Sequence, residues 1–223
     1  MDNRKQRSER RTDALSRERI VEAAIEILDA DGEAALTFRA LASRLSTGSG
    51  AIYWHVADKG ELLAACADAI VVPLMRNEEM AGEPREGIRL IALRIFDAID
   101  RHPWVGSQLF REPWRFGMLQ MFETVGARLL KLGVPDKALF DCVSALVSYI
   151  LGVAGQNAAN ARMHPEGTDR SSLLAAVAAR WEESDAEDYV AVRKMATQLR
   201  DHDDRAQFLA GIDLLLNGIA HLR

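Results

Sequence analysis

Residues 36–63 read LTFRALASRLSTGSGAIYWHVADKGELL, and this stretch combines two short helical patterns with a tight break between them. Thr37 suits the N-cap of a helix over Phe38–Leu45, because its hydroxyl can accept a backbone hydrogen bond from the first turn. Ser46–Ser49 interrupt the apolar periodicity, and Gly50–His55 then form a second helix of barely two turns. The pattern is that of a helix-turn-helix, whose second helix enters the major groove of DNA.

The apolar positions of the two helices predict which side chains face the core. Ile52 and Val56 of the second helix can pack against the apolar residues of the first, namely Phe38, Leu41, Ala42 and Leu45. The other second-helix side chains then face outward: Ser49, Gly50, Ala51, Tyr53, Trp54 and His55. Exposed Tyr and Trp would indicate a surface that phosphates or base edges cover. The alternative is that these aromatics are core residues of a small helical unit.

Segments on either side complete an N-terminal helical unit over residues 16–65. Ser16 suits the N-cap of an amphipathic helix that runs to Asp31, and Gly32 follows where a left-handed residue commonly ends a helix. Asp58 begins a fourth helix, with Glu61 three residues later in the arrangement of a capping box.

The rest of the chain also has a helical pattern, which predicts an all-α fold. Gly and Pro fall between periodic blocks rather than inside alternating ones. We expect a basic, disordered arm over residues 1–15, the helix-turn-helix domain over 16–65, and a larger helical bundle over 66–223. The expected helices of the bundle are Arg85–Arg101, Trp104–Arg111, Trp114–Leu132, Asp136–Arg162, Ser171–Glu182, Ala186–Leu199 and Asp204–Leu222.

Charge is distributed unevenly along the chain. Residues 1–11 contain five basic and two acidic residues, although the whole chain of 223 residues has a net charge of -5. A basic arm of this kind can contact DNA phosphates even in an acidic protein. For the arm alone, a solubilising tail is an equally good interpretation.

Several classes of function lack support in the sequence. Cys66 and Cys142 lie far apart with no CxxC pattern, and the five histidines form no HxxxH motif, so we expect no metal and no cofactor. The chain shows no nucleophile elbow, no phosphate-binding glycine loop and no paired carboxylates at catalytic spacing, which disfavours an enzyme. We also expect no stretch of the ~18 uncharged apolar residues that a membrane span needs. The N-terminus is charged, unlike a signal peptide, which predicts a cytoplasmic protein without a membrane partner.

Residues Ser16 to about Ala65 resemble the tetracycline-repressor (TetR) family of bacterial transcription regulators. The opening helix of that family is similar to IVEAAIEILDADG, its second helix to LTFRALASRL, and its recognition segment to AIYWHVADKGELL. The match keeps register over some fifty residues. This resemblance implies that the helix-turn-helix binds DNA.

The resemblance also implies roles for individual residues of this chain. Arg39 would reach a base or a phosphate, Thr37 a phosphate, and Lys59 a phosphate at the start of the fourth helix. The start of the recognition helix would read bases, through Ser49, Gly50 and Ala51. Tyr53 and His55 would contact phosphates, and Trp54 the backbone and groove wall. This chain departs from the family at Ala51, which lacks the hydroxyl common there.

The C-terminal half resembles the tetracycline-repressor branch of the family. Residues 145–152 and 208–218 are similar to the two long helices through which that branch dimerises. In the second of these, a wide apolar stripe would form the homodimer interface, with Ile212, Leu215, Leu216 and Ile219. The alternative is that this helix is an internal core helix.

The middle helices are rich in aromatic and thioether side chains. The resemblance implies that they bind a small-molecule inducer, which we expect to be largely apolar or aromatic. Leu109 and Gln156 stand where the branch has metal- and drug-binding side chains, so a magnesium–tetracycline chelate is not implied. For any single residue, ordinary core is the alternative. The expected ligand-binding residues are Trp104, Phe110, Trp114, Met118, Met121, Phe122, Tyr149, Gln156 and Asn160.

Taken with the resemblance, the sequence predicts a ligand-responsive transcriptional regulator, with a repressor favoured. It would bind a palindromic operator in double-stranded DNA as a homodimer, since a two-fold-symmetric site requires two copies of the chain. The competing classes are an all-helical enzyme and a protein-interaction module that does not bind DNA.

Overall fold

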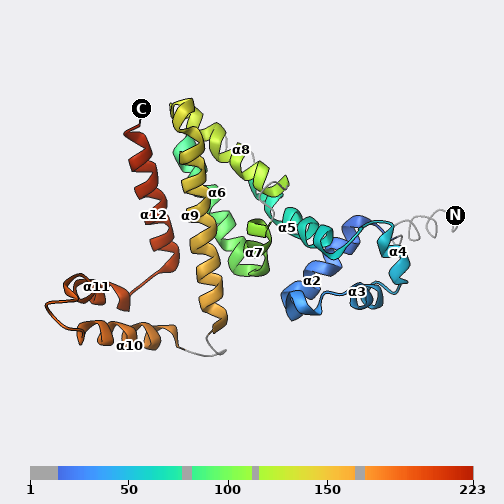
Figure 1. Ribbon diagram of the computed structural model, residues 1–223, viewed down its shortest axis with the longest axis horizontal. Coiled ribbons are helices and arrows are strands. Elements are labelled where there is room, and N and C mark those ends of the chain that lie inside the picture. Colours follow the sequence, from blue (N-terminus) through green and yellow to red (C-terminus); the bar gives the residue numbers. More distant parts are fainter. Residues whose placement is uncertain (1–14, 77–81, 112–115, 164–168, 223) are drawn as a thin grey trace, which may run out of the picture.

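The computed structural model describes residues 15–76, 82–111, 116–163 and 169–222, and every regular element in these ranges is a helix (Figure 1). The all-α prediction is confirmed. Most of the basic arm over residues 1–15 lies outside the described residues. The helices are α2 (Arg17–Ala35), α3 (Phe38–Arg44), α4 (Ser49–Tyr53), α5 (Lys59–Met75), α6 (Pro84–Arg101), α7 (Trp104–Arg111), α8 (Phe116–Lys131), α9 (Asp136–Met163), α10 (Arg170–Glu182), α11 (Val190–Arg200) and α12 (Asp204–Ala220).

The N-cap residues predicted from the sequence begin the helices of the N-terminal unit. Ser16 Oγ accepts a hydrogen bond from the Arg19 N–H at 3.3 Å, Thr37 Oγ1 one from Ala40 at 3.1 Å, and Asp58 Oδ1 one from Glu61 at 2.8 Å. Gly32 has a φ of 76°, as its predicted left-handed position requires. Gly32 is non-helical and kinks the helix where the sequence predicts its end, and one further turn follows before the chain leaves α2 at Ala35.

The C-terminal helices pack around α9, which contacts α6, α8 and α12. Our expectation that no stretch is long and apolar enough to span a membrane is wrong, because Asp136–Asn160 meets both criteria with a mean hydropathy of 1.8. Beyond Asp141 this stretch has no charged residue, but its Gly, Ser, Gln and Asn side chains keep it from being uniformly apolar. In the fold α9 is a core helix, and it buries Leu146 and Ile150 among its neighbours.

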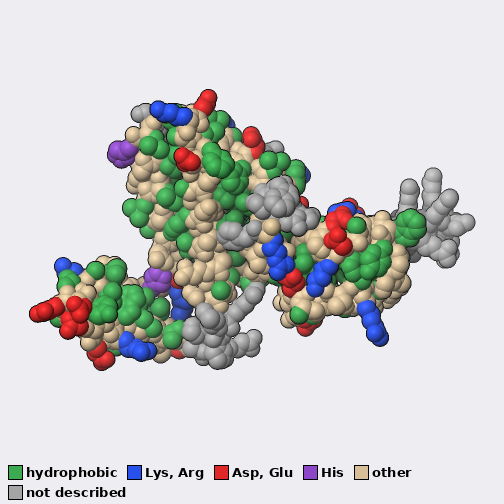
Figure 2. All heavy atoms as spheres, in the orientation of Figure 1, with side chains coloured by type: hydrophobic (Ala, Val, Ile, Leu, Met, Phe, Trp, Pro, Cys, Tyr) green, Lys and Arg blue, Asp and Glu red, His purple; other side chains and the backbone are tan. Residues whose placement is uncertain are grey.

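Helices α10 and α11 form a hairpin beyond the end of α9 and pack mainly against each other (Figure 1). Figure 2 shows hydrophobic side chains gathered on this hairpin. Tyr189, Val190 and Met195 are among its exposed apolar residues. The hairpin is therefore an appendage of the bundle rather than part of its core.

Two arginines join α6 to α12 through a single carboxylate. Arg89 donates a hydrogen bond to Asp213, and Arg85 lies 3.4 Å from the same side chain and 2.8 Å from Asn217 Oδ1. The Arg89 hydrogen bond, followed by the charges of Arg89 and Arg85, holds the pKa of Asp213 below its ordinary value of 3.8. Both ends of the contact are partly exposed, so solvent weakens it.

Replacing Asp213 with Asn is expected to lower the free energy of unfolding by about 1 kcal/mol near neutral pH. Because the folded pKa is lowered, the stabilisation is present above the unfolded value of 3.8 and disappears as the pH falls through the folded value. Urea unfolding of the two proteins should therefore converge in acid. The exposed Asp31, changed to Asn, is the control. A difference that persists unchanged in acid would contradict this explanation.

Candidate nucleic-acid interface

The turn between α3 and α4 is closed by backbone hydrogen bonds at the end of α3. The Thr47 N–H donates to Ala42 O at 2.9 Å, and the Ser46 N–H donates to Ser43 O at 3.2 Å. Ser46 has a φ of 51°, the left-handed conformation in which many helices end, usually with Gly. These bonds end α3 and set the direction in which the chain leaves it.

Two buried apolar side chains hold the recognition helix α4 against the core of the N-terminal unit: Ile52 within the helix and Val56 just after it. The two aromatic residues at the end of this helix, Tyr53 and Trp54, face solvent. The side chain of Trp54 is 89% exposed and that of Tyr53 is 54% exposed, with Tyr53 stacked on Phe38 at a centroid distance of 4.4 Å. The alternative interpretation, that these aromatics form the core of the unit, is therefore wrong.

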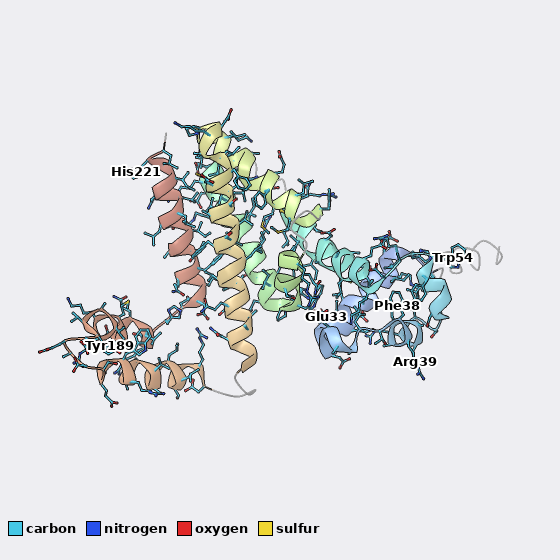
Figure 3. The ribbon with its side chains drawn as sticks, viewed as in Figure 1. Glu33, Phe38, Arg39, Trp54, Tyr189 and His221 are labelled. Atoms are coloured by element: carbon cyan, nitrogen blue, oxygen red, sulfur yellow. The ribbon has the colours of Figure 1, made fainter. Side chains whose placement is uncertain are left out.

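The side chains predicted to contact DNA lie on neighbouring helices. Arg39 of α3 and Trp54, which follows α4, both project from the end of the molecule distant from the C-terminal helices (Figure 3). Thr37 is exposed, with its hydroxyl engaged as the cap of α3. Gly50 is exposed as well, and the remaining predicted side chains on this helix and its end are half-buried: Ser49, Ala51 and His55.

Lys59 differs from its predicted setting. Its ammonium donates to the backbone carbonyl of Glu33 at 2.6 Å, so it ties the start of α5 to the end of α2. The same group has three donors, and two of them stay available after this bond. Contact between Lys59 and phosphate thus stays a prediction, and holding the two helices together is an additional role.

Sequence reasoning missed a second basic residue beside the recognition helix. Arg17 donates to the His55 carbonyl at 3.2 Å and pairs with Glu61 at 2.8 Å. Glu61 also accepts the Ala57 N–H, and this bond, with the Arg17 contact, lowers the pKa of Glu61. Arg17 is a first-turn residue with no motif around it, so only the fold shows that it stiffens the end of α4.

The predicted ligand-binding residues that the structure describes are distributed over several parts of the fold. Met118 and Met121 are core residues, and Tyr149 packs half-buried against Phe208 and over Gly211. The remainder line three separate hollows or lie outside the described residues. Trp104 lines a cavity beside α2, Phe122 a groove between α8 and α9, and Gln156 and Asn160 a cleft toward α10, while the Phe110 side chain and Trp114 are not described.

The predicted dimer stripe on α12 is also mostly internal. Ile212, Leu216 and Ile219 are buried within the chain, where α12 packs on α6 and α9, and Leu215 is half-buried. For the three buried residues, the alternative of an internal core helix is correct. The large apolar side chain that α12 exposes is that of Leu214, which is 73% exposed.

Helix α2 of the N-terminal unit is held to the C-terminal helices through Asp29. The Trp104 indole N–H donates to Asp29 Oδ1 at 2.8 Å, and His102 Nδ1 lies 2.8 and 2.9 Å from the two carboxylate oxygens. A carboxylate only accepts, so Nδ1 carries the proton in this contact. One turn further along α2, Glu33 accepts from Gln108 and Arg111 of α7. We call these contacts of Asp29 and Glu33 the junction latch.

A cavity of about 650 Å³ lies directly beside the junction latch. One wall comes from α2 and the other from α7 and α9, so the cavity separates the N-terminal unit from the C-terminal helices. Its lining includes Leu28, Asp29, Gly32, Glu33, Pro103, Trp104, Gly106, Ser107, Gly155 and Ala159.

Changing Trp104 to Phe should remove the indole donor while keeping an aromatic ring. We expect the free energy of unfolding to fall by about 1 kcal/mol, since one hydrogen bond to a partly exposed charge is lost. In a double-mutant cycle with Asp29→Asn, the two changes should couple by at least ~0.5 kcal/mol in urea unfolding. Trp181→Phe is the control, and purely additive effects would rule the latch out.

The two cysteines are unreactive by environment. Burial raises the pKa of the Cys66 thiol to about 12, and burial likewise raises the pKa of Cys142. Thiolate is the nucleophilic and metal-binding form, so neither side chain is an activated group. In the described ranges, no cluster of three His, Cys, Asp or Glu side chains is placed to hold a metal ion.

Comparison with known proteins agrees with this geometry. Residues 20–66 match the family of bacterial regulatory proteins, tetR family. Over the full length, the chain is similar to the transcriptional regulator SCO7222, a TetR from Streptomyces coelicolor. The two are 47% identical, the match covers 94% of this chain and 99% of SCO7222, and the TM-score is 0.86.

Two further relatives extend the comparison. A regulator of the helix-turn-helix type from Saccharopolyspora erythraea is 28% identical over 178 residues, which cover 79% of this chain and 75% of that protein. BioQ from Mycobacterium smegmatis is 26% identical, with 94% of this chain and 100% of that chain covered and a TM-score of 0.68. BioQ has also been crystallised with its double-stranded DNA operator.

The matched residues 20–66 contain the buried anchors of α4 and the exposed Trp54 and Tyr53. The similarity to SCO7222 extends through the C-terminal helices as well. The chain therefore belongs to the TetR family of bacterial transcriptional regulators, which bind operator DNA and are not enzymes.

Proposed function

We propose that this regulator is a cytoplasmic repressor that binds a palindromic operator as a homodimer and releases it when a small aromatic inducer binds. The observation that carries the DNA-binding part is the exposure of Tyr53 and Trp54 at the end of a helix that Ile52 and Val56 anchor rigidly. A surface aromatic pair on a fixed helix favours a macromolecular partner. BioQ, a relative with the same fold, binds duplex DNA.

The DNA contacts follow from the placement of the side chains. Ser49, Gly50 and Ala51 open the recognition helix, where residues of a helix-turn-helix meet base edges. Arg39 is exposed on α3 and would reach a base or the adjacent backbone. Tyr53 and His55 would contact phosphates around them. Because few of these side chains offer specific donors, backbone contacts would supply much of the affinity.

The dimer interface would lie on the exposed faces of α9 and α12, because the apolar stripe of α12 is largely buried within the chain. Leu214 stands at the centre of the α12 face. Small side chains surround it and would let helices of two copies approach closely in a four-helix arrangement. The face comprises Ala145, Ser148 and Gly152 on α9, with Ala210, Leu214 and Gly218 on α12.

An inducer would act at the junction cavity. Trp104 is the predicted ligand-binding residue whose surroundings join both parts of the chain. A molecule in that cavity would contact α2 on one side and α7 on the other. Its binding energy would therefore differ between orientations of the N-terminal unit, as release from DNA requires.

A gel-shift titration with the DNA that flanks the regulator's own gene tests this function. We expect a discrete shifted complex that survives excess unrelated DNA. Tyr53→Ala, which removes a phosphate contact, should weaken the complex, while the exposed Leu119→Ala on α8 should not. A wild-type protein that is folded and dimeric, but binds flanking and unrelated DNA alike, would contradict the proposal.

A further inference from the structure

The junction cavity has a lining of unusual chemistry for an apolar inducer. Two carboxylates, Asp29 and Glu33, lie in its wall with about a third of each side chain exposed. Among the described residues that line it there is no Lys or Arg. Glycines on three elements leave backbone in the wall, and Trp104 supplies a flat apolar surface. The cavity therefore suits a planar aromatic ring that carries a positive charge.

The Asp29 carboxylate accepts hydrogen bonds from two donors, which a ligand with stronger donors could replace. Its partners are the indole N–H of Trp104 and Nδ1 of His102, each reaching it across the junction. An amidinium group presents two parallel N–H donors to a carboxylate. Such charge-assisted, bidentate bonds are roughly twice as strong as bonds from neutral donors. A ligand of this kind could take over both oxygens of Asp29.

We propose that the junction cavity is an effector site for planar aromatic amidines or guanidines. The cationic fork binds Asp29 in place of the Trp104 indole N–H, and the ring lies against Trp104 with Gly155 opposite. Glu33, one turn along α2, is a second carboxylate in the wall, where Arg111 already pairs with it, so Asp29 carries the recognition of the cation.

Occupation of this site would remove one of the contacts that hold α7 to α2. The bond between Trp104 and Asp29 joins residues 75 positions apart in the chain, so its loss loosens the attachment of the N-terminal unit, while Glu33 keeps its contacts with Gln108 and Arg111. That this changes operator affinity rests on the proposed function. Coupling of the usual size, ~1–3 kcal/mol, corresponds to ~5–150-fold in affinity.

Three probes of one shape separate charge from ring binding: 2-naphthamidine, the neutral 2-naphthamide and the anionic 2-naphthoate. A full-length chain with Trp54, Trp114 and Trp181 changed to Phe keeps Trp104 as the reporter. We expect saturable changes in its emission with the amidine, binding at least ~10-fold weaker with the amide, and none with the naphthoate. Equal binding of amidine and amide, or no binding of the amidine, would overturn the proposal.

Variants locate the site independently of Trp104 emission. In calorimetry on the otherwise wild-type chain, Asp29→Asn should weaken amidine binding at least ~10-fold, whereas Asp31→Asn on the same helix should not. Trp104→Phe should strengthen it, because a competing donor is removed. A structural role alone would not produce that increase. Binding unchanged by Asp29→Asn, or weakened by Trp104→Phe, would show that the fork does not replace the indole.

A filling substitution keeps the test valid if the Asp29 variant does not fold. A Cβ at Gly155 would meet no atom within 4 Å, and this glycine lies within α9, where most residues favour a helix more than Gly does. Gly155→Leu should fold and abolish amidine binding with both carboxylates intact. Retained binding would place the ligand elsewhere.

Release of DNA is measured separately. With operator bound, 2-naphthamidine should lower the affinity at least ~5-fold and 2-naphthamide should not. If the amidine binds as described but the protein recognises no operator, the proposed function fails and the site remains. If operator binding is normal and the amidine does not bind, only the effector site fails.

Discussion

Changing Leu214 to Glu should convert the protein into monomers and weaken operator binding by ~10²–10⁴-fold, the size of effect lost when two linked sites become one. Leu214 is 73% exposed on α12, so the folded monomer tolerates the charge. In the proposed dimer a two-fold axis would place this carboxylate near its symmetry copy, where both would lose water. Light scattering gives the mass, and fluorescence anisotropy gives the operator affinity.

Two control variants separate this interface from general effects. Leu119→Glu on α8 changes a residue of similar exposure outside the proposed face, and it should remain dimeric. Ile212→Glu buries a charge inside the monomer, so it should unfold the chain rather than dissociate it. A Leu214→Glu variant that is folded and still dimeric would show that the subunits meet through another surface.

The second large effect is expected for Arg39→Ala. Loss of one specific arginine contact costs ~1–3 kcal/mol, and a dimer loses two, so operator affinity should fall by at least ~30-fold. Anisotropy titrations with the operator measure this change. The variant should remain folded, because Arg39 is exposed and caps no helix.

Arg44→Ala on the same helix is the matched control. Its guanidinium donates to Glu26 of α2 at 2.8 Å, so its removal should affect stability slightly and operator affinity within ~3-fold. If Arg39→Ala and Arg44→Ala weaken binding equally, α3 does not approach the DNA in the proposed way.

The N-terminal unit could be predicted from the sequence because its signals are local. Thr37 and Asp58 cap helices that begin one residue later, and each acts within three residues of itself. Helical spacing likewise predicts that Ile52 and Val56, four residues apart, both face the core. Gly32 interrupts α2 at the predicted place, but the short turn that follows it, up to Ala35, was not predicted.

Predictions for the C-terminal half were less accurate, because they depended on which helix packs against each apolar face. The spacing of Ile212, Leu216 and Ile219 identifies an apolar face, but it does not say whether that face meets its own bundle or a second copy. Here α6 and α9 of the same chain cover it. The aromatic and thioether residues of the middle helices are likewise divided among the core, a groove and a cavity.

The junction latch had no signal in the sequence. Asp29 lies on the polar side of an amphipathic helix, where an acidic residue is ordinary, and its partners are 73 and 75 residues away. Arg17 and Glu61 are comparable, because their pairing depends on the packing of α2 against α5. Contacts of this kind require the tertiary fold.

The most direct test of the central claim is selection by the wild-type protein from a pool of random DNA duplexes. The affinity of the most enriched duplex is then measured by titration. The claim is that α3 and α4 of two copies read operator DNA. It predicts an enriched palindrome with half-sites about one helical turn or a multiple of it apart, bound at least ~10³-fold more tightly than its scrambled sequence. Enrichment of no sequence, or of a site without two-fold symmetry, would contradict it.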